Sequence, residues 1–116
     1  MKQIKAIVRP SKVDAVKNAL VAIDVQGLTI CEARGFGRQR GQVEKYRGNE
    51  FRVDFIPKVQ ITTVVDDDRV EAVITAISEA ARTGEIGDGK LFISPVDEVV
   101  RISKVYVPLG RSPAQT

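Results

Sequence analysis

The chain has 116 residues, 43% of them hydrophobic, and a formal net charge of +3 at pH 7. This length predicts one domain with a modest core, and so small a positive charge does not by itself indicate nucleic-acid binding. Histidine is absent, which excludes histidine-dependent triads and histidine metal sites, and the single Cys31 excludes an internal disulfide. We expect a cytoplasmic protein, because the sequence contains no signal-like or long apolar segment.

The first third of the chain predicts a strand, a helix and a second strand. In residues 2–9, apolar side chains alternate with more polar ones, which is typical of a strand. Ser11 is placed to cap a helix in which apolar residues recur at helical spacing to about Asp24. Residues 28–34, between two glycines, predict the second strand, and Cys31 within it is expected to be a small core residue.

Residues 35–55 keep neither strand nor helix periodicity for long and are rich in glycine and charge. A loop of this length in a small domain is usually functional or disordered. One interpretation is a solvated excursion in which Tyr46 and Phe51 pack against the loop itself. The other, which we favour, is a loop that docks on a partner, because exposed aromatic and arginine side chains are typical of protein interfaces.

The second half of the chain repeats the order strand, helix, strand. Residues 58–65 alternate as a third strand, and the second helix follows and runs to a glycine-rich loop. The three carboxylates of Asp66–Asp68 stand where this helix begins, so N-capping and the helix dipole explain them better than a metal site. Residues 91–94 predict the fourth strand, and residues 99–107 can supply another edge segment.

Two strand–helix–strand units in one chain predict a ferredoxin-like βαββαβ sandwich. This is an α+β fold in which an antiparallel sheet carries both helices on one face. The other face also carries apolar residues, such as Ile7 and Val64. A sheet that is apolar on both faces favours burial of the second face, and self-association is the simplest means.

The sequence TGEIGDGK, residues 83–90, joins the second helix to the fourth strand. Its Gly84–Lys90 portion matches a P-loop formally, yet Leu91 replaces the Ser or Thr that would hold Mg²⁺. The predicted order is also helix, loop, strand, so no helix N-terminus would lie under the phosphates. Two interpretations remain: a glycine nest with a lysine that holds an anion, or a flexible helix end followed by a tight turn.

Four groups of motifs are long enough to be specific. They are Gly35-Phe36-Gly37-Arg38-Gln39, Tyr46-Arg47-Gly48, Val53-Asp54-Phe55 with Pro57-Lys58, and Ala81-Arg82-Thr83-Gly84 through Ile86-Gly87-Asp88-Gly89-Lys90. In these motifs, and over residues 1–102 as a whole, the chain resembles the PII signal-transduction family. The resemblance implies one domain, residues 1–116, that assembles as a homotrimer and binds ATP or ADP between subunits. It also implies that 2-oxoglutarate binds beside MgATP and that a long T-loop, residues 36–56, controls an enzyme or a membrane transporter.

The resemblance further implies a role for each matching residue. The nucleotide-binding positions are Thr29, Gly35, Arg38, Gly87, Asp88, Gly89, Lys90 and Arg101, and the 2-oxoglutarate positions are Phe36, Gly37, Gln39, Lys58 and Gly87. Gln39 matches a residue that helps to coordinate Mg²⁺ with ATP, and Arg47, Glu50 and Phe51 belong to the partner-binding loop. An amide oxygen suits Mg²⁺ and an ammonium suits a carboxylate, so the roles of Gln39 and Lys58 are chemically consistent. Residues 82–90 match a glycine-rich B-loop, and residues 103–116 form a variable C-terminal tail.

The chain departs from the family pattern at positions that bear on regulation. Phe51 replaces the tyrosine that is uridylylated in many members, so that modification is excluded at this position. Ser103 replaces a second phosphate-binding arginine, and the usual ending is absent from the tail. The alternative is therefore a divergent PII-like transporter accessory that senses adenine nucleotides together with a different second ligand.

Two other classes of function are compared with the regulatory one. An RNA-binding ferredoxin-like domain would show stacking aromatics on its central strands, whereas the four Phe and two Tyr residues lie mostly in predicted loops. An enzyme would show an activated nucleophile or a tuned acid–base pair, and none is visible. We therefore expect a regulator that is not an enzyme, binds no nucleic acid and reaches a membrane through a transporter partner.

Overall fold

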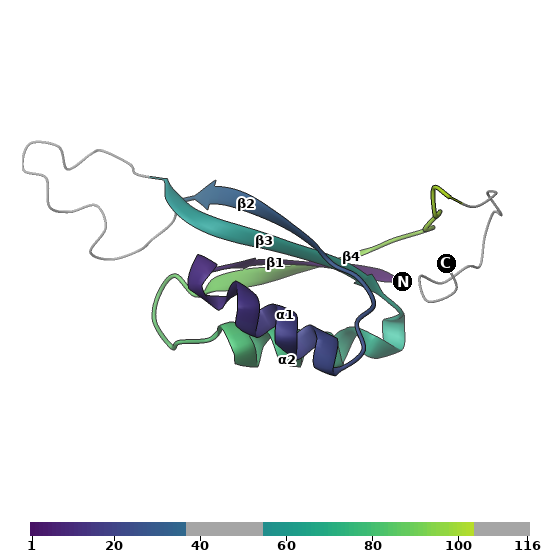
Figure 1. The fold of residues 1–116 in the computed structure, drawn as a ribbon, viewed down its shortest axis with the longest axis horizontal. Coiled ribbons are helices and arrows are strands. Elements are labelled where there is room, and N and C mark those ends of the chain that lie inside the picture. The colour runs from purple at the N-terminus through teal and green to yellow at the C-terminus, as the bar shows by residue number, and fades with distance from the viewer. Residues whose placement is uncertain (37–54, 104–116) are drawn as a thin grey trace, which may run out of the picture.

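The computed structural model describes residues 1–36 and 55–103. Its elements are β1 (Lys2–Val8), α1 (Val13–Ala22), β2 (Thr29–Gly35), β3 (Ile56–Val65), α2 (Val70–Ala81) and β4 (Gly89–Pro95), with short 3₁₀ helices at Pro10–Lys12 and Asp67–Arg69. The strands form one antiparallel sheet in the order β2-β3-β1-β4. Both helices cover the same face of this sheet (Figure 1). The arrangement confirms the predicted ferredoxin-like βαββαβ sandwich.

The core lies between the sheet and the helices, because alternate residues of the central strands β1 and β3 point to the helical side. Its buried residues are Ile4, Ala6 and Val8 of β1, Val59, Ile61, Thr63 and Val65 of β3, Val16 and Leu20 of α1, and Val73, Ile77 and Ala81 of α2. In each helix the buried residues are four positions apart, so they form one stripe that faces the sheet. The hydroxyl of Thr63 donates a hydrogen bond to the Gly27 carbonyl at 2.7 Å, which satisfies a buried polar group.

The opposite face of the sheet combines apolar side chains with lysines. Ile7 and Val64, on the central strands, are half-buried, and Phe92, on the edge strand β4, is exposed. The strand register places three lysines on this same face, and these are Lys5, Lys58 and Lys90. The face is therefore less uniformly apolar than the sequence predicts.

Cys31 is exposed, so the prediction that it is a core residue is wrong. It lies on β2, an edge strand, and is paired with Gln60 of β3. Gln60 stands between the buried Val59 and Ile61 and points away from the helices, so Cys31 does as well. The local sequence identifies the strand without showing which of its faces meets the helices.

The two predicted helix caps are also wrong. A 3₁₀ turn precedes each α-helix, and neither turn nor helix begins with a side-chain capping hydrogen bond. The backbone supplies bonds instead, from the Lys12 amide to the Arg9 carbonyl and from the Arg69 amide to the Asp66 carbonyl, both at 2.9 Å. The Asp67 carboxylate pairs with the terminal ammonium of Met1 at 3.0 Å, and this hydrogen-bonded ion pair lowers the pKa of Asp67.

The segment after β4 does not form the additional strand expected at residues 99–107, as far as it is described. Residues 99–103 are irregular and end in a turn. The side chain of Ile102 is fully exposed. None of the described helices is long and apolar enough to cross a membrane.

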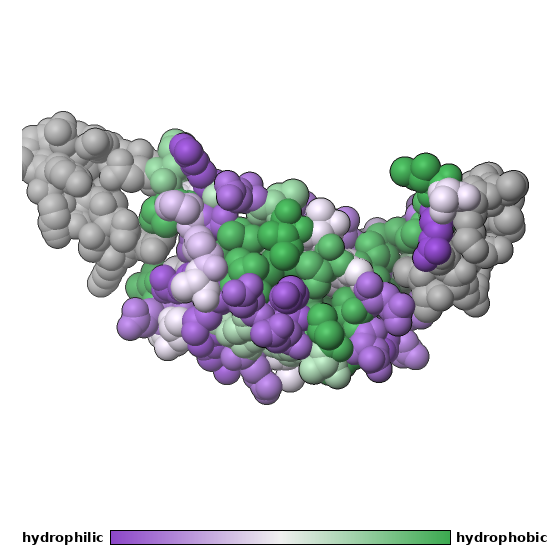
Figure 2. Space-filling model, in the orientation of Figure 1, coloured by the Kyte–Doolittle hydropathy of each residue, from purple (hydrophilic) through white to green (hydrophobic). Residues whose placement is uncertain are grey.

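Apolar side chains also reach the surface. Figure 2 shows them gathered over the middle of the face on which β2 passes above α1, with polar side chains around them. Exposed large hydrophobic residues include Val21 of α1 and Ile30 of β2. An exposed apolar patch bordered by polar residues is typical of a protein–protein contact surface.

We expect Leu20→Ala to lower the free energy of unfolding by about 2–5 kcal/mol, because Leu20 is fully buried and its loss leaves a cavity. The neighbouring Val21 is 59% exposed, so Val21→Ala should change this free energy by less than about 0.5 kcal/mol. Both are measured by chemical denaturation at one protein concentration. Equal effects of the two substitutions would contradict the assignment of the core stripe.

Candidate functional site

The candidate site is built around the loop that joins α2 to β4. The helix ends at Ala81, and the first strand residue after the loop is Gly89. The order helix, loop, strand agrees with the sequence analysis and differs from a P-loop, in which a helix follows the loop. Three glycines of the loop region have positive φ angles, which are 91° at Gly84, 103° at Gly87 and 118° at Gly89. Side chains disfavour this conformation, so the loop path requires glycine at these positions.

Gly89 is required for a second reason, which is its close approach to β1. It lies opposite Val8 in the sheet register. A β-carbon at this position would lie 1.8 Å from the carbonyl oxygen of Ile7. Gly89 and Ile7 belong to strands that pair with each other, so neither strand can move away without losing sheet hydrogen bonds.

The carboxylate of Asp88 holds the first part of the loop. It accepts hydrogen bonds from the backbone amides of Thr83 at 2.8 Å and Gly84 at 2.9 Å, and from the Thr83 hydroxyl. Arg9 donates to the same carboxylate through Nε at 3.1 Å. These bonds, the one from the Thr83 hydroxyl above all, hold the pKa of Asp88 well below its usual range. The ionised carboxylate therefore stabilises the fold above its ordinary pKa of 3.8, and this contribution is lost as the pH falls below that value.

Two basic side chains, one just after β1 and one in β3, reach the middle of the loop. Arg9, just after β1, donates through Nη2 to the Ile86 carbonyl at 3.0 Å. Lys58 of β3 donates through Nζ to the Gly87 carbonyl at 2.6 Å. Partial burial, and then the charge of Arg9, lower the pKa of Lys58, while the Asp88 carboxylate acts in the opposite direction. The site is thus a glycine loop with two cations beside it.

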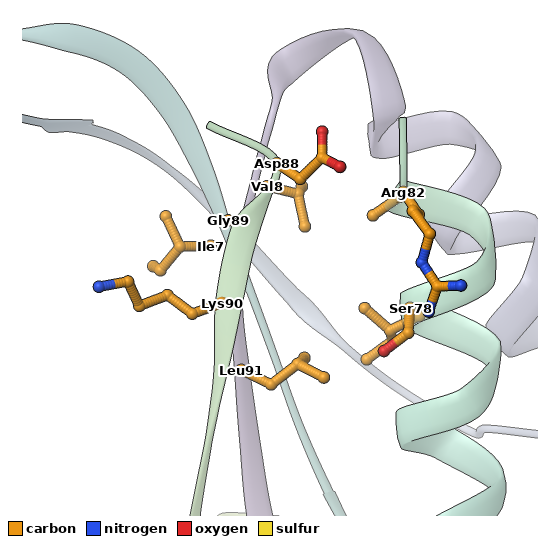
Figure 3. A pocket seen from close by; sticks show the side chains of 10 residues that line it. Ile7, Val8, Ser78, Arg82, Asp88, Gly89, Lys90 and Leu91 are labelled. Carbon is orange, nitrogen blue, oxygen red and sulfur yellow. The ribbon is translucent and has the colours of Figure 1, made fainter. Parts of the chain in front are cut away.

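Lys90 and Asp88 lie on different sides of the sheet. Figure 3 shows the Lys90 side chain next to Ile7 on one side, and Leu91, Ser78 and Arg82 on the other. The side of Leu91 contains a cavity of about 200 Å³ between β4 and the end of α2. Strand alternation explains the difference, because Lys90 follows directly after Gly89 and turns to the face without helices. Of the residues expected to bind phosphate, Lys90 extends outward and Asp88 is engaged in the loop itself.

Other expected nucleotide contacts lie away from the glycine loop. Thr29 begins β2, the edge strand opposite β4, and the register places it level with Phe92, two rows from Lys90 and three strands away. Arg101 lines a second cavity, of about 340 Å³, together with Gly27, Val64, Asp66 and Arg69 among others. The expected nucleotide-binding residues therefore form two groups. Gly35 and Gly87–Lys90 lie toward the end of the sheet at which β4 begins, whereas Thr29 lies on the edge strand opposite β4 and Arg101 lies toward the other end of the sheet.

Phe36 and Phe55 mark the two ends of the long loop between β2 and β3. Their rings meet edge to face, with centroids 6.2 Å apart, and both side chains are exposed. The remaining predicted loop residues, which are Gly37, Arg38, Gln39, Arg47, Glu50 and Phe51, lie outside the described residues. Within residues 1–36 and 55–103, no cluster of Cys, Asp and Glu side chains is arranged to hold a metal ion.

Comparison with known proteins identifies the family. The profile of the family described as "Nitrogen regulatory protein P-II" matches residues 1–106. This chain belongs to the P-II family. The P-II proteins of Nostoc punctiforme and Azospirillum brasilense are each 57% identical to it over 102 residues, which are 88% of this chain and 91% of those proteins. The P-II protein of Synechocystis sp. is 58% identical over the same coverage.

The fold agrees with a solved P-II structure. The crystal structure of Arabidopsis thaliana PII bound to citrate is 41% identical, covers 88% of this chain and 82% of its own, and superposes with a TM-score of 0.72. P-II proteins are regulatory proteins, which agrees with the expectation that this chain is not an enzyme.

The sequence analysis did not identify two side chains that contact the glycine loop from within or beside it. They are Arg9 and Thr83, and both bond to the Asp88 carboxylate. Arg9 is distant from the glycine loop in sequence and lay outside every motif. One signal was available in the predicted antiparallel sheet: β1 pairs antiparallel with β4, and this pairing brings the end of one strand to the start of the other. A charged residue at the end of β1 is thereby placed beside the loop that precedes β4.

We expect Gly89→Ala to lower the free energy of unfolding by about 1–3 kcal/mol, because the added methyl group meets the Ile7 carbonyl and the φ angle is unfavourable. Gly27→Ala is the matched control, since a β-carbon there meets nothing within 4 Å. Thermal and denaturant unfolding measure both. If both substitutions lowered the free energy of unfolding by the same small amount, the result would contradict the close approach of Gly89 to the Ile7 carbonyl.

Proposed function

We propose that this P-II protein is a signal-transduction regulator of nitrogen metabolism that senses ATP, ADP and 2-oxoglutarate. It acts as a homotrimer in the cytoplasm, with one adenine nucleotide in each cleft between subunits and Mg²⁺ accompanying ATP. The T-loop, residues 36–56, controls a target enzyme or membrane transporter. Phe51 has no phenolic oxygen, so this control operates without uridylylation at that position.

The division of the expected nucleotide contacts into two groups carries this proposal. Lys90 and the glycine loop lie at the start of the edge strand β4, whereas Thr29 lies on the opposite edge strand β2 and Arg101 lies toward the other end of the sheet. One chain cannot surround a nucleotide with both groups, because β3 and β1 lie between β2 and β4, a width of roughly 14 Å, and Arg101 lies beside Val64 and Val65 toward the other end of the sheet. A second copy of the chain can place the end of its sheet that carries Arg101 against the glycine loop of the first copy. The exposed apolar residues, which include Val21 and Ile30, supply surface for such contacts.

The chemistry of the glycine loop favours anionic ligands. Arg9 and Lys58 lie beside it, and Lys90 extends from it on the open face of the sheet. An ammonium such as Lys58 suits a carboxylate, which is the group that 2-oxoglutarate would present to it. The relative from Arabidopsis was solved with citrate, which is also a carboxylate. Phe36 and Gly87 are the other described residues that we assign to the 2-oxoglutarate site, with Gly37 and Gln39.

The sheet offers little for an RNA-binding alternative. An RNA-binding ferredoxin-like domain stacks bases on aromatic side chains of its central strands. The central strands here, β1 and β3, contain no aromatic residue. Among the strand residues that the structure describes, the aromatic side chain on the open face is Phe92, on the edge strand β4.

We expect ATP to bind in the presence of Mg²⁺, and Lys90→Ala to weaken binding by about 1.5–3 kcal/mol through loss of a charge-assisted hydrogen bond. Isothermal titration calorimetry measures both, and Lys17→Ala on the exposed side of α1 is the charge-matched control. The titration is repeated with 2-oxoglutarate. Binding of 2-oxoglutarate only with MgATP supports the full proposal. If a nucleotide binds and 2-oxoglutarate does not, the result indicates the transporter accessory with a different second ligand. If Lys90→Ala binds ATP as tightly as the parent does, the assignment of Lys90 to phosphate binding is refuted.

We expect deletion of residues 40–49 to leave the trimer intact, because the proposed subunit contacts lie on the sheet and its edges. Light scattering coupled to a sizing column measures the mass of the parent and of the deletion variant. A monomeric parent would refute the shared nucleotide site. A trimeric parent with a monomeric deletion variant would show that the loop holds the assembly together.

A further inference from the structure

We propose that Arg9 is a positioning residue for the nucleotide site, which holds the glycine loop in its binding form through the carboxylate of Asp88. The inference rests on the function proposed above, because it assigns the loop to phosphate binding. It adds a residue from the end of β1, outside the motifs that identify the site. The charges of Arg9 and Asp88 also act on Lys58, the residue that we assign to the binding of 2-oxoglutarate.

The guanidinium of Arg9 makes two bonds to the loop at once. Nε donates to the Asp88 carboxylate at 3.1 Å, and Nη2 donates to the Ile86 carbonyl at 3.0 Å. A planar guanidinium presents these donors in a rigid fork, so both bonds fix the loop relative to β1. The side chains of Arg9 and Asp88 are 27% and 22% exposed, which limits the weakening of this ion pair by water.

Asp88 passes this restraint to the beginning of the loop. Its carboxylate accepts from the amides of Thr83 and Gly84, five and four residues earlier in the chain. Arg9 therefore restrains the middle of the loop directly and its first residues through Asp88. The remaining part, Gly87–Lys90, runs from these fixed points into β4, which is paired with β1. The backbone amides and the Lys90 side chain at this end are thereby held in one arrangement before any ligand arrives.

The geometry argues against a direct contact between Arg9 and the phosphates. The Nε and Nη2 atoms of Arg9 already donate to loop acceptors. The side chain of Lys90, the expected phosphate ligand, extends on the other side of the sheet from Leu91 and Arg82 (Figure 3). Arg9 acts on Lys90 through the loop that connects them. Its charge also contributes to the lowered pKa of Lys58, so the three charged groups are coupled.

The test is a double-mutant cycle on ATP affinity, with Arg9→Met, Asp88→Asn and the double variant. Each single variant should bind ATP roughly tenfold more weakly, and the double variant about as weakly as the weaker single one, because both remove the same restraint. Lys17→Met, which removes an exposed positive charge on α1, should bind like the parent. Unfolding curves show whether each variant is folded. Additive losses would overturn the proposal, since they would indicate a direct contact between Arg9 and the nucleotide.

Two measurements without nucleotide test the restraint itself. Hydrogen exchange of the Thr83 and Gly84 amides should be faster in Arg9→Met than in the parent, and unchanged in Lys17→Met. NMR titration of Lys58 should show a higher pKa in Arg9→Met and a lower one in Asp88→Asn, because each substitution removes one opposing charge. Arg9→Lys restores the charge without the fork, so it should restore the Lys58 pKa more fully than the protection of the amides.

These readouts separate failure of the proposal from failure of the proposed function. If the parent binds no ATP while Arg9→Met accelerates loop exchange, the nucleotide function fails and the restraint stands. If Arg9→Met binds ATP like the parent and leaves the exchange of both amides unchanged, Arg9 is not a positioning residue. Weaker binding in Arg9→Met with unchanged exchange also overturns the proposal, because the loss would not pass through the loop.

Discussion

The pairing of β1 with both β3 and β4 is the constraint on which the site depends. Val8 lies opposite Val59 on one side and Gly89 on the other, so the end of β1 meets the beginning of two other strands. Antiparallel pairing brings Arg9, Lys58 and the glycine loop together at that end of the sheet, although they are far apart in sequence. The pairing is stabilised in turn by the core residues that alternate along β1 and β3. The binding geometry and the stability of the fold therefore have a common origin.

The glycine loop holds its shape by a different means from a P-loop. In a P-loop the following helix presents its N-terminus to the phosphates. Here a strand follows, and the loop is shaped by an internal carboxylate, that of Asp88, and by side chains from two other strands. The anion binding that we propose for this loop would then depend on the cations around it. Such a site depends on contacts between strands, which explains why a residue outside the family motifs, Arg9, takes part in it.

The sequence predicted the fold well and individual contacts less well. Alternation and helical spacing located every strand and helix of the sandwich, because a sheet and a helix each expose one face to the core at a fixed period. The predictions that were wrong concern single side chains. Ser11 and Asp66 do not cap their helices, because 3₁₀ turns supply backbone bonds instead, and Cys31 lies on the uncovered face. The expected strand at 99–107 is not formed in its described part, since apolar composition does not ensure a pairing partner.

By itself the sequence determined the family, the order of the elements and the requirement for glycine in the loop. These depend on local patterns and motifs, which can be read without knowing what lies nearby in space. The tertiary structure decided that the Asp88 carboxylate turns into the loop and that Arg9 reaches it across 79 positions of the chain. It also decided that Thr29 lies on the edge strand opposite Lys90 and that Arg101 lies toward the other end of the sheet. These relations depend on which strands pair and in which register, and that choice is made by the packing of the whole core.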